Sequence, residues 1–523
     1  MRTDVWAALL LTASLTPFGA LAQSDAPLSA IDWLSQSVST PAGTEVETQD
    51  DTPSEPPVTP DGFMPEDIAT STIDGPSRDA VGLISPAKSG LPERLWGAGL
   101  TEEIAAHLTA EEVETLPSLQ SLFRTLLLAE ARPPVDSDGS GRLLMARIDK
   151  LLSLGALDEA QALIDAAGDT WPELFRRSFD VALLTGAEDR ACEQMRAAPD
   201  LAPTFPARVF CLARSGDWNA AALTLRTAQA LGYITPEQDA LLSRFLDPDL
   251  YEGEPTPAPP TPVTPLDLRM FEAIGEPLPS LGLPLAFAHA DLGPANGWKR
   301  QLEAAERLAR AGVLDANRLL GLYTDEGEPS ASGGIWDRVD AFQRFDIALA
   351  SGDAASVERT LPNAWDRMTE AEIETTFAGL FARKLMAIDL GDEAGRIAFR
   401  VALLSPEFAT AAAGRKALDP TEEFLIGLAS GDVTGMIAPD SLGRAIAPAF
   451  SGPAVAPEGT ESARLLAEDR YGEAVLTAIE RISVGVQGDL RQVTEGLATL
   501  RAAGLEDVAR RTALELMLLE RRG

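Results

Sequence analysis

The chain has 523 residues, 45% of them hydrophobic, and carries a formal net charge of −37. Because single hydrophobic cores stop growing at about 250–300 residues, this length predicts two folded lobes or one elongated array of repeats. Such a negative charge repels phosphate backbones and anionic bilayers, which disfavours nucleic acids and membrane surfaces as partners. It favours basic partners or cations, although a solvated acidic surface is the simpler interpretation.

Residues 1–22 have the layout of a secretory signal peptide. An apolar run from Val5 to Leu15 follows Arg2, and Ala20-Leu21-Ala22 places small residues at the cleavage positions. An uncleaved membrane anchor is the alternative, but a spanning helix needs about 20 apolar residues without a breaker, and Pro17 interrupts this run. We therefore expect cleavage after Ala22. No later stretch is apolar enough to predict insertion into a membrane.

The composition also bears on where the chain works. Only five of the 43 basic residues are lysine, and alanine is abundant, a bias associated with GC-rich bacterial genomes. Together with the signal peptide, this bias predicts a periplasmic protein of a Gram-negative bacterium.

Residues 23–90 form a predicted disordered tether that is acidic and rich in proline. From Ser39 to about Gly90 the sequence is dense in Pro, Thr, Asp, Glu and Ser, so it lacks the apolar surface needed to offset the entropy of ordering. We expect this tether to be mobile and sensitive to proteases. A short apolar patch, Ile31-Asp32-Trp33-Leu34, is consistent with a docking peptide or with a few turns of helix.

Helical patterning begins near Thr101, and the chain is predicted to be all-α. Strand signals are weak because no run combines alternating polarity with β-branched residues. Capping motifs predict helix starts at four places, Thr109–Glu112, Thr235–Gln238, Thr369–Glu372 and Asp419–Glu422.

Internal repeats give the strongest signal in the sequence. Each repeat has an apolar helix end, a turn residue and a new apolar-periodic run, which is the pattern of an αα-hairpin. The turn residues recur every 30 or 31 positions in the N-terminal part and every 35–40 in the C-terminal part: Gly155, Gly186 and Gly216, then Gly312, Gly352, Gly391, Gly431, Asp469 and Gly504. Such a period predicts an α-solenoid of stacked helical hairpins.

The hairpins resemble degenerate tetratricopeptide-type repeats, most closely at residues 153–167 and 213–231. The resemblance extends loosely over residues 143–250 and 296–520, without the regular consensus and the steady period of about 34 residues of that family. It implies a concave surface that binds peptides or proteins. It carries over no particular binding residue.

A proline-rich run divides the repeats into two predicted lobes. The density of proline in residues 252–265 excludes helix and favours an extended polyproline II conformation. We therefore place an N-terminal lobe at 91–250, a linker at 251–265 and a C-terminal lobe at 266–523. The alternative is a long surface loop inside one continuous solenoid.

We assign no catalytic residue, cofactor or metal ligand from the sequence. The two histidines, His107 and His289, lie far apart and outside any metal-ligand pattern. Residues 136–143 resemble the start of a calcium loop, but position 12 is Arg147 where a bidentate glutamate is needed, so we expect an acidic loop there. Among 80 acidic residues, no glycosidase-type carboxylate pair stands out.

Cys192 and Cys211 are the only cysteines, and an even count in an exported chain predicts a disulfide. Two buried free thiols are the alternative. We expect Cys192 on the helix after Gly186 and Cys211 on the helix before Gly216, so the bond would join one hairpin to the next. The spacing is not C-x-x-C, which favours a stabilising role over a redox role.

Together these features predict a non-catalytic periplasmic adaptor or scaffold that binds protein or peptide partners in the cell envelope. One alternative is an accessory subunit or relic of a peptidoglycan-processing enzyme, because superhelical repeat domains also surround the cleft of lytic enzymes. Another is a structural envelope protein whose acidic surface binds divalent cations weakly. The sequence specifies neither the partner nor the oligomeric state.

Overall fold

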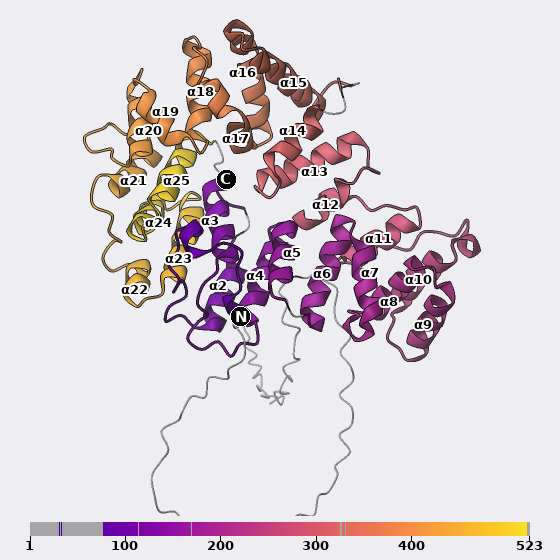
Figure 1. The fold of residues 1–523 in the computed structure, drawn as a ribbon. Coiled ribbons are helices and arrows are strands. Elements are labelled where there is room, and N and C mark those ends of the chain that lie inside the picture. Colours follow the sequence, from indigo (N-terminus) through magenta and orange to yellow (C-terminus); the bar gives the residue numbers. More distant parts are fainter. Residues whose placement is uncertain are drawn as a thin grey trace, which may run out of the picture.

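The protein is all-α in the part of the chain that the structure describes, which confirms the predicted class. The computed structural model describes residues 31, 33, 77–112, 114–168, 170–324, 327–329 and 331–519. Within these ranges every regular element is a helix, apart from an isolated parallel bridge between Ile84 and Ala129 (Figure 1). None of the helices found there has the length and apolarity needed to cross a bilayer. The predicted signal peptide and its cleavage after Ala22 lie outside the described residues.

The helices before the proline-rich run have 10 to 14 residues, apart from the single turn of α1. They are α1 Pro86–Ser89, α2 Thr101–Ala110, α3 Pro117–Leu128, α4 Arg142–Ser153, α5 Leu157–Ala166, α6 Pro172–Thr185, α7 Glu188–Ala197, α8 Phe205–Arg214, α9 Trp218–Ala230 and α10 Pro236–Leu246. Helices of this length are marginal in isolation, so their stability must come from packing.

The second half continues the same pattern of short helices. They are α11 Pro265–Ala273, α12 Ala288–Asp291, α13 Trp298–Arg310, α14 Ala316–Thr324, α15 Ile335–Ser351, α16 Ala354–Glu370, α17 Glu374–Leu385, α18 Asp392–Leu403, α19 Phe408–Gly414, α20 Pro420–Ser430, α21 Ser441–Phe450, α22 Glu461–Ala467, α23 Tyr471–Gly485, α24 Leu490–Ala502 and α25 Glu506–Leu518. Short 3₁₀ turns are η1 Arg78–Ala80, η2 Pro199–Leu201, η3 Pro248–Tyr251, η4 Ser280–Gly282 and η5 Leu285–Phe287.

The predicted turn residues separate consecutive helices, as the repeat pattern requires. Eight of the nine have a positive φ, including Asp469 at 60°, the one non-glycine in the set. Gly391 is the exception, with φ of −63° as the N-cap of α18, where its amide donates to Glu358 Oε1 at 2.6 Å. The helix–turn–helix pattern is therefore confirmed even where the backbone conformation differs.

Two of the four predicted capping motifs begin helices. Thr235 forms a complete capping box at the start of α10, and Asp419 caps α20. The motifs beginning at Thr109 and Thr369 are wrong, because α2 and α16 end there. The Thr109 hydroxyl instead donates to the carbonyl of Ala105 within the last turn of α2.

The first and last helices of the chain meet. Consecutive helices pack against each other along most of the chain. In addition, α25 contacts α3 and α20, and α23 contacts α2 and α3, so the C-terminal end lies beside α3 (Figure 1). In an open solenoid each repeat contacts only its neighbours. These contacts depart from the predicted elongated array and close one end of the chain onto the other.

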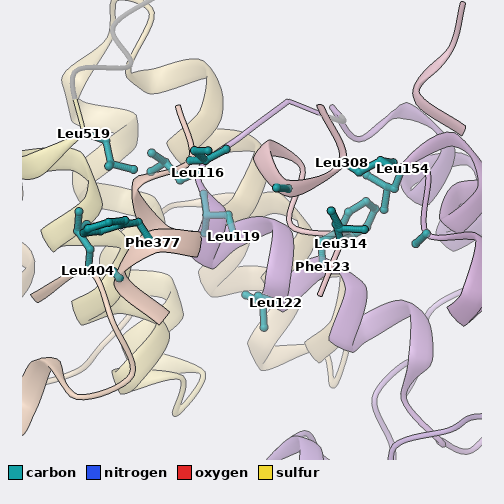
Figure 2. Packing of buried hydrophobic residues seen from close by; sticks show 14 of the residues in the cluster. Leu116, Leu119, Leu122, Phe123, Leu154, Leu308, Leu314, Phe377, Leu404 and Leu519 are labelled. Carbon is teal, nitrogen blue, oxygen red and sulfur yellow. The ribbon is translucent and has the colours of Figure 1, made fainter. Parts of the chain in front are cut away.

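Helix α3 is the centre of this closure. Eight of its twelve residues are buried, and together they cover most of its circumference. Figure 2 shows Leu119 and Phe123 of α3 in one packed cluster with residues from distant parts of the chain: Leu154, Leu308, Leu314, Phe377, Leu404 and Leu519. A helix that is buried over most of its circumference is stable only where neighbours surround it.

The N-terminus of α3 is capped by the last helix. Its own N-cap residue, Leu116, has no side chain that accepts a hydrogen bond. Both carboxylate oxygens of Glu515 in α25 accept from the amide of Ser118, at 3.0 and 2.9 Å, and one also accepts from its hydroxyl at 2.7 Å. A buried carboxylate at this position satisfies free amides and interacts favourably with the helix dipole.

Carboxylates from other parts of the chain also cap the N-termini of α2 and α4. Asp136 accepts from the amide and the hydroxyl of Thr101 at the start of α2, at 2.8 and 2.7 Å. Asp79 accepts from the amide of Leu144 in the first turn of α4 at 3.0 Å. Helices whose own N-caps are Leu or Gly thus take their capping oxygens from elsewhere in the fold.

The predicted tether ends earlier than expected. Residues 77–90 are folded and include η1 and α1. The amide of Leu83 donates to the carbonyl of Leu128 at 2.8 Å, and Glu130 donates to Ile84 at 2.9 Å. The predicted end of the tether at residue 90 is therefore wrong. Residues 83 and 84 form backbone hydrogen bonds with the end of α3 and the residues after it, which the composition of the segment did not indicate. Apart from Ile31 and Trp33, residues 23–76 lie outside the described residues.

The predicted division into lobes at residues 251–265 does not match a break in the core. A second hydrophobic cluster joins Leu241 and Leu242 of α10 to Leu266 and Phe271 of α11, across the proline-rich run. Helix α11 also packs against α6. The proline-rich run thus lies beside a cluster that contains residues from both sides of it, and the division into two lobes stays a prediction.

This second cluster forms the core of an arm, α7 to α10, which packs onto α6 and α11 (Figure 1). Within the arm, Cys192 of α7 and Cys211 of α8 form a disulfide with a Cα–Cα distance of 5.1 Å. The predicted pairing and its position between two hairpins are confirmed. A small core gains most from such a covalent link, because it buries less apolar surface.

We expect reduction of this disulfide to lower the melting temperature without abolishing helicity. The chain-entropy treatment of a loop of this length gives about 3 kcal/mol. Circular dichroism with and without reductant measures the shift, and thiol titration of the denatured, unreduced protein checks the bond. Two titratable thiols in that sample would contradict the pairing.

Candidate functional site

A small cavity lies between the C-terminal end of α2 and helix α23. Its volume is about 140 Å³, and its lining comes from the C-terminal end of α2 with the residues after it, and from α23. The lining residues are His107, Ala110, Glu111, Glu112, Glu480, Ser483 and Val484. Three carboxyl groups from two parts of the chain therefore share one small space.

Glu111 is the most unusual of these groups. It is only 6% exposed, and its Oε2 atom has no hydrogen-bond partner. Among the residues that the structure describes, it is the one buried carboxylate oxygen in this condition. Other buried carboxylates have strong partners, as Asp149 has in Arg177 and Glu306 in Arg338. A buried polar atom without a partner is costly and calls for an explanation.

The pKa of Glu111 is raised to about 8, mainly by burial and to a smaller extent by the charges of Glu480 and Glu112. Lys150 opposes the shift. Burial removes water that would solvate the carboxylate, and like charges disfavour its ionisation. Glu111 is therefore mostly protonated at neutral pH while the cavity holds no cation.

Lys150 lies beside the cavity but does not pair with the carboxylates. Its ammonium donates to the backbone carbonyls of Thr109 and Glu111, at 3.3 Å for the former, and it faces the ring of Phe123 at 5.7 Å. Burial lowers the pKa of Lys150. The lysine thus satisfies the carbonyls at the end of α2 and leaves the carboxyl groups without a cationic donor.

The remaining polar groups of the cavity have weak or neutral partners. The Nε2 atom of His107 lies 3.9 Å from Glu480 Oε2, beyond hydrogen-bonding distance. The hydroxyls of Ser483 and Thr115 form a hydrogen bond of 2.6 Å. The sequence gave no role to His107 and no reason to link it to Glu111 and Glu480.

His289, the second histidine, has a structural role and does not line this cavity. It is buried in α12, and its Nε2 donates to the carbonyl of Gly155 at 2.8 Å. Burial lowers the pKa of His289, so the ring is neutral at neutral pH. The bond joins α12 to the turn between α4 and α5.

The side chains of the calcium-like loop, residues 136–143, form hydrogen bonds within the fold. Asp136 caps α2, and Asp138 Oδ1 accepts from the amide of Ser140 at 2.8 Å. At position 12, the buried guanidinium of Arg147 donates to the carbonyls of Leu127, Val81 and Ala129. In the described parts of the chain, no group of three or more His, Cys, Asp and Glu side chains is arranged as a metal site.

A second candidate site holds part of the predicted tether. Trp33 is 6% exposed, and its ring packs edge-on against Phe287 of η5 with centroids 5.5 Å apart. Ile31 packs against the same hydrophobic cluster. These two residues contradict a tether that is disordered throughout. They agree with the docking-peptide alternative for the Ile31–Leu34 patch.

Comparison of the chain with known protein families, with curated protein sequences and with solved structures finds no match. The resemblance to tetratricopeptide-type repeats therefore stays a prediction, based on the hairpins at residues 153–167 and 213–231.

We expect Glu111→Gln to remove a pH-dependent cost of folding. The folded protein keeps the proton that the unfolded chain loses above its ordinary pKa of 4.5, so stability falls as pH rises from about 4.5 to about 8. The cost grows by up to about 1.4 kcal/mol per pH unit in that window. Urea unfolding at several pH values should show a variant increasingly more stable than wild type. A stability difference independent of pH would contradict this account.

Proposed function

We propose that the protein is a non-catalytic periplasmic scaffold whose helical hairpins, stacked as repeats and closed on themselves, bind a protein or peptide partner. The observation that supports this role most strongly is the docking of Trp33. An apolar side chain from a segment far outside the helical repeats is buried against Phe287. The helical body thus already accommodates a peptide-like segment of its own chain.

The chemistry of this contact is typical of peptide recognition. Large aromatic side chains bury much apolar area at little entropic cost and dominate binding energies at interfaces. Phe287 is fully buried with Trp33 packed against it, so its ring forms part of the surface that receives the tryptophan. A segment held on the same chain competes with external ligands at a high effective concentration. We therefore propose that an external peptide with a similar aliphatic and aromatic pair binds at the same place.

The arm supplies a second argument for interaction with partners. Three large apolar side chains of α9 and its end are well exposed, with Trp218 at 51%, Leu223 at 68% and Leu231 at 61%. The disulfide holds the helices beneath them. Disulfides persist in oxidising compartments, which supports a periplasmic location.

The test uses the full chain with Trp33→Ala and a labelled peptide of residues 27–38. We expect fluorescence anisotropy to show saturable binding of the peptide to the variant. Wild type should bind at least tenfold more weakly, because its own segment occupies the site. A Trp218→Ala protein, altered only on the exposed arm, should behave like wild type.

Two results would count against this function. Failure of the Trp33→Ala protein to bind the peptide, with its melting temperature unchanged, would remove the peptide site. Release of muropeptides from peptidoglycan by the purified wild-type protein would contradict a non-catalytic role and favour the enzymatic alternative.

A further inference from the structure

We propose that the cavity between α2 and α23 binds the ammonium group of a small alkylamine or of a partner's lysine side chain. This site is separate from the Trp33 site and does not depend on it. The lining of the cavity includes three glutamates, Glu111, Glu112 and Glu480, and contains no lysine or arginine.

The pairing of buried acids elsewhere in the fold indicates what is missing here. Buried Asp291, Glu422 and Glu473 each form an ion pair with a neighbouring arginine of the chain. Glu111 is as deeply buried, yet one of its oxygens has no partner. Lys150 is committed to two backbone carbonyls. A bound cation would supply the partner that the chain itself does not provide.

The geometry favours an ammonium over a guanidinium. A guanidinium presents a planar fork suited to one carboxylate, whereas an ammonium directs three donors to separate acceptors. Glu111 and Glu480 belong to different parts of the chain, so the cavity offers carboxylate acceptors on separate sides. Ala110 and Val484 provide apolar surface for an alkyl chain. The volume of about 140 Å³ is close to that of cavities, about 150 Å³, that hold a molecule the size of benzene.

Binding should be coupled to ionisation of Glu111. A cation near this carboxylate favours its charged form, so part of the binding energy is spent on removing the proton at neutral pH. Affinity is therefore expected to rise with pH up to about 8. Alkylamines remain protonated over this range, since the ammonium of lysine has a pKa of about 10.4.

The experiment is calorimetric titration of the full-length protein with n-butylammonium chloride at about pH 8.5. We expect saturable binding with one site per chain, and at least tenfold weaker binding to Glu480→Gln. Glu111→Gln is a second test, because it removes the charge from the buried position while its own effect on stability is expected to be favourable. Glu114→Gln removes an exposed charge outside the cavity and should bind as wild type does.

Further titrations distinguish between the possible ligands. Binding of both butylammonium and a capped lysine amide supports a partner's lysine as the occupant, whereas binding of butylammonium alone supports a free amine. Equal binding of neutral 1-butanol, or unchanged binding by both cavity variants, would overturn the proposal. Displacement of the amine by micromolar calcium would replace it with a metal site.

Discussion

Helix α3 can bury most of its surface only if the last helices of the chain return to cover it. Eight of its twelve residues are buried, and its first turn takes its capping oxygens from Glu515 of α25. Neither the apolar surface nor the free amides of α3 would be satisfied in an array with separated ends. This requirement fixes where α23 and α25 lie, and with them the wall of the cavity beside α2.

The closure has an electrostatic consequence. It brings Glu480 of α23 close to Glu111 at the end of α2, in a protein whose net charge is already −37. The charge of the exposed Glu480 disfavours ionisation of the buried Glu111, so closure is opposed unless a proton or a cation compensates these like charges. A ligand that binds only the closed state stabilises it by mass action, so occupancy of the cavity and closure of the chain would support each other.

The local features of this fold were predictable from sequence, and the long-range ones were not. Turn residues such as Asp469 mark the hairpins because the left-handed conformation is set by a few neighbouring residues. The Cys192–Cys211 pair joins consecutive helices, so the even cysteine count and the neighbouring turn residues were enough to predict it. Ser118 and Glu515 carry no mutual signal, and the motif at Thr109 looks like a helix start although α2 ends there. Glu111 lies beside Glu480 only because α23 packs against α2, so its sequence context did not indicate the cavity.

The most direct test of the closure is hydrogen–deuterium exchange on the full chain with Glu515→Ala, with Asp507→Ala on the exposed face of the same helix as the control. Removing a buried hydrogen-bonding carboxylate costs about 1–3 kcal/mol. The account predicts faster exchange in α3 and α25 together, with the disulfide-linked arm and the control unchanged. Faster exchange confined to α25, as expected when the last hairpin of an open solenoid frays alone, would contradict it.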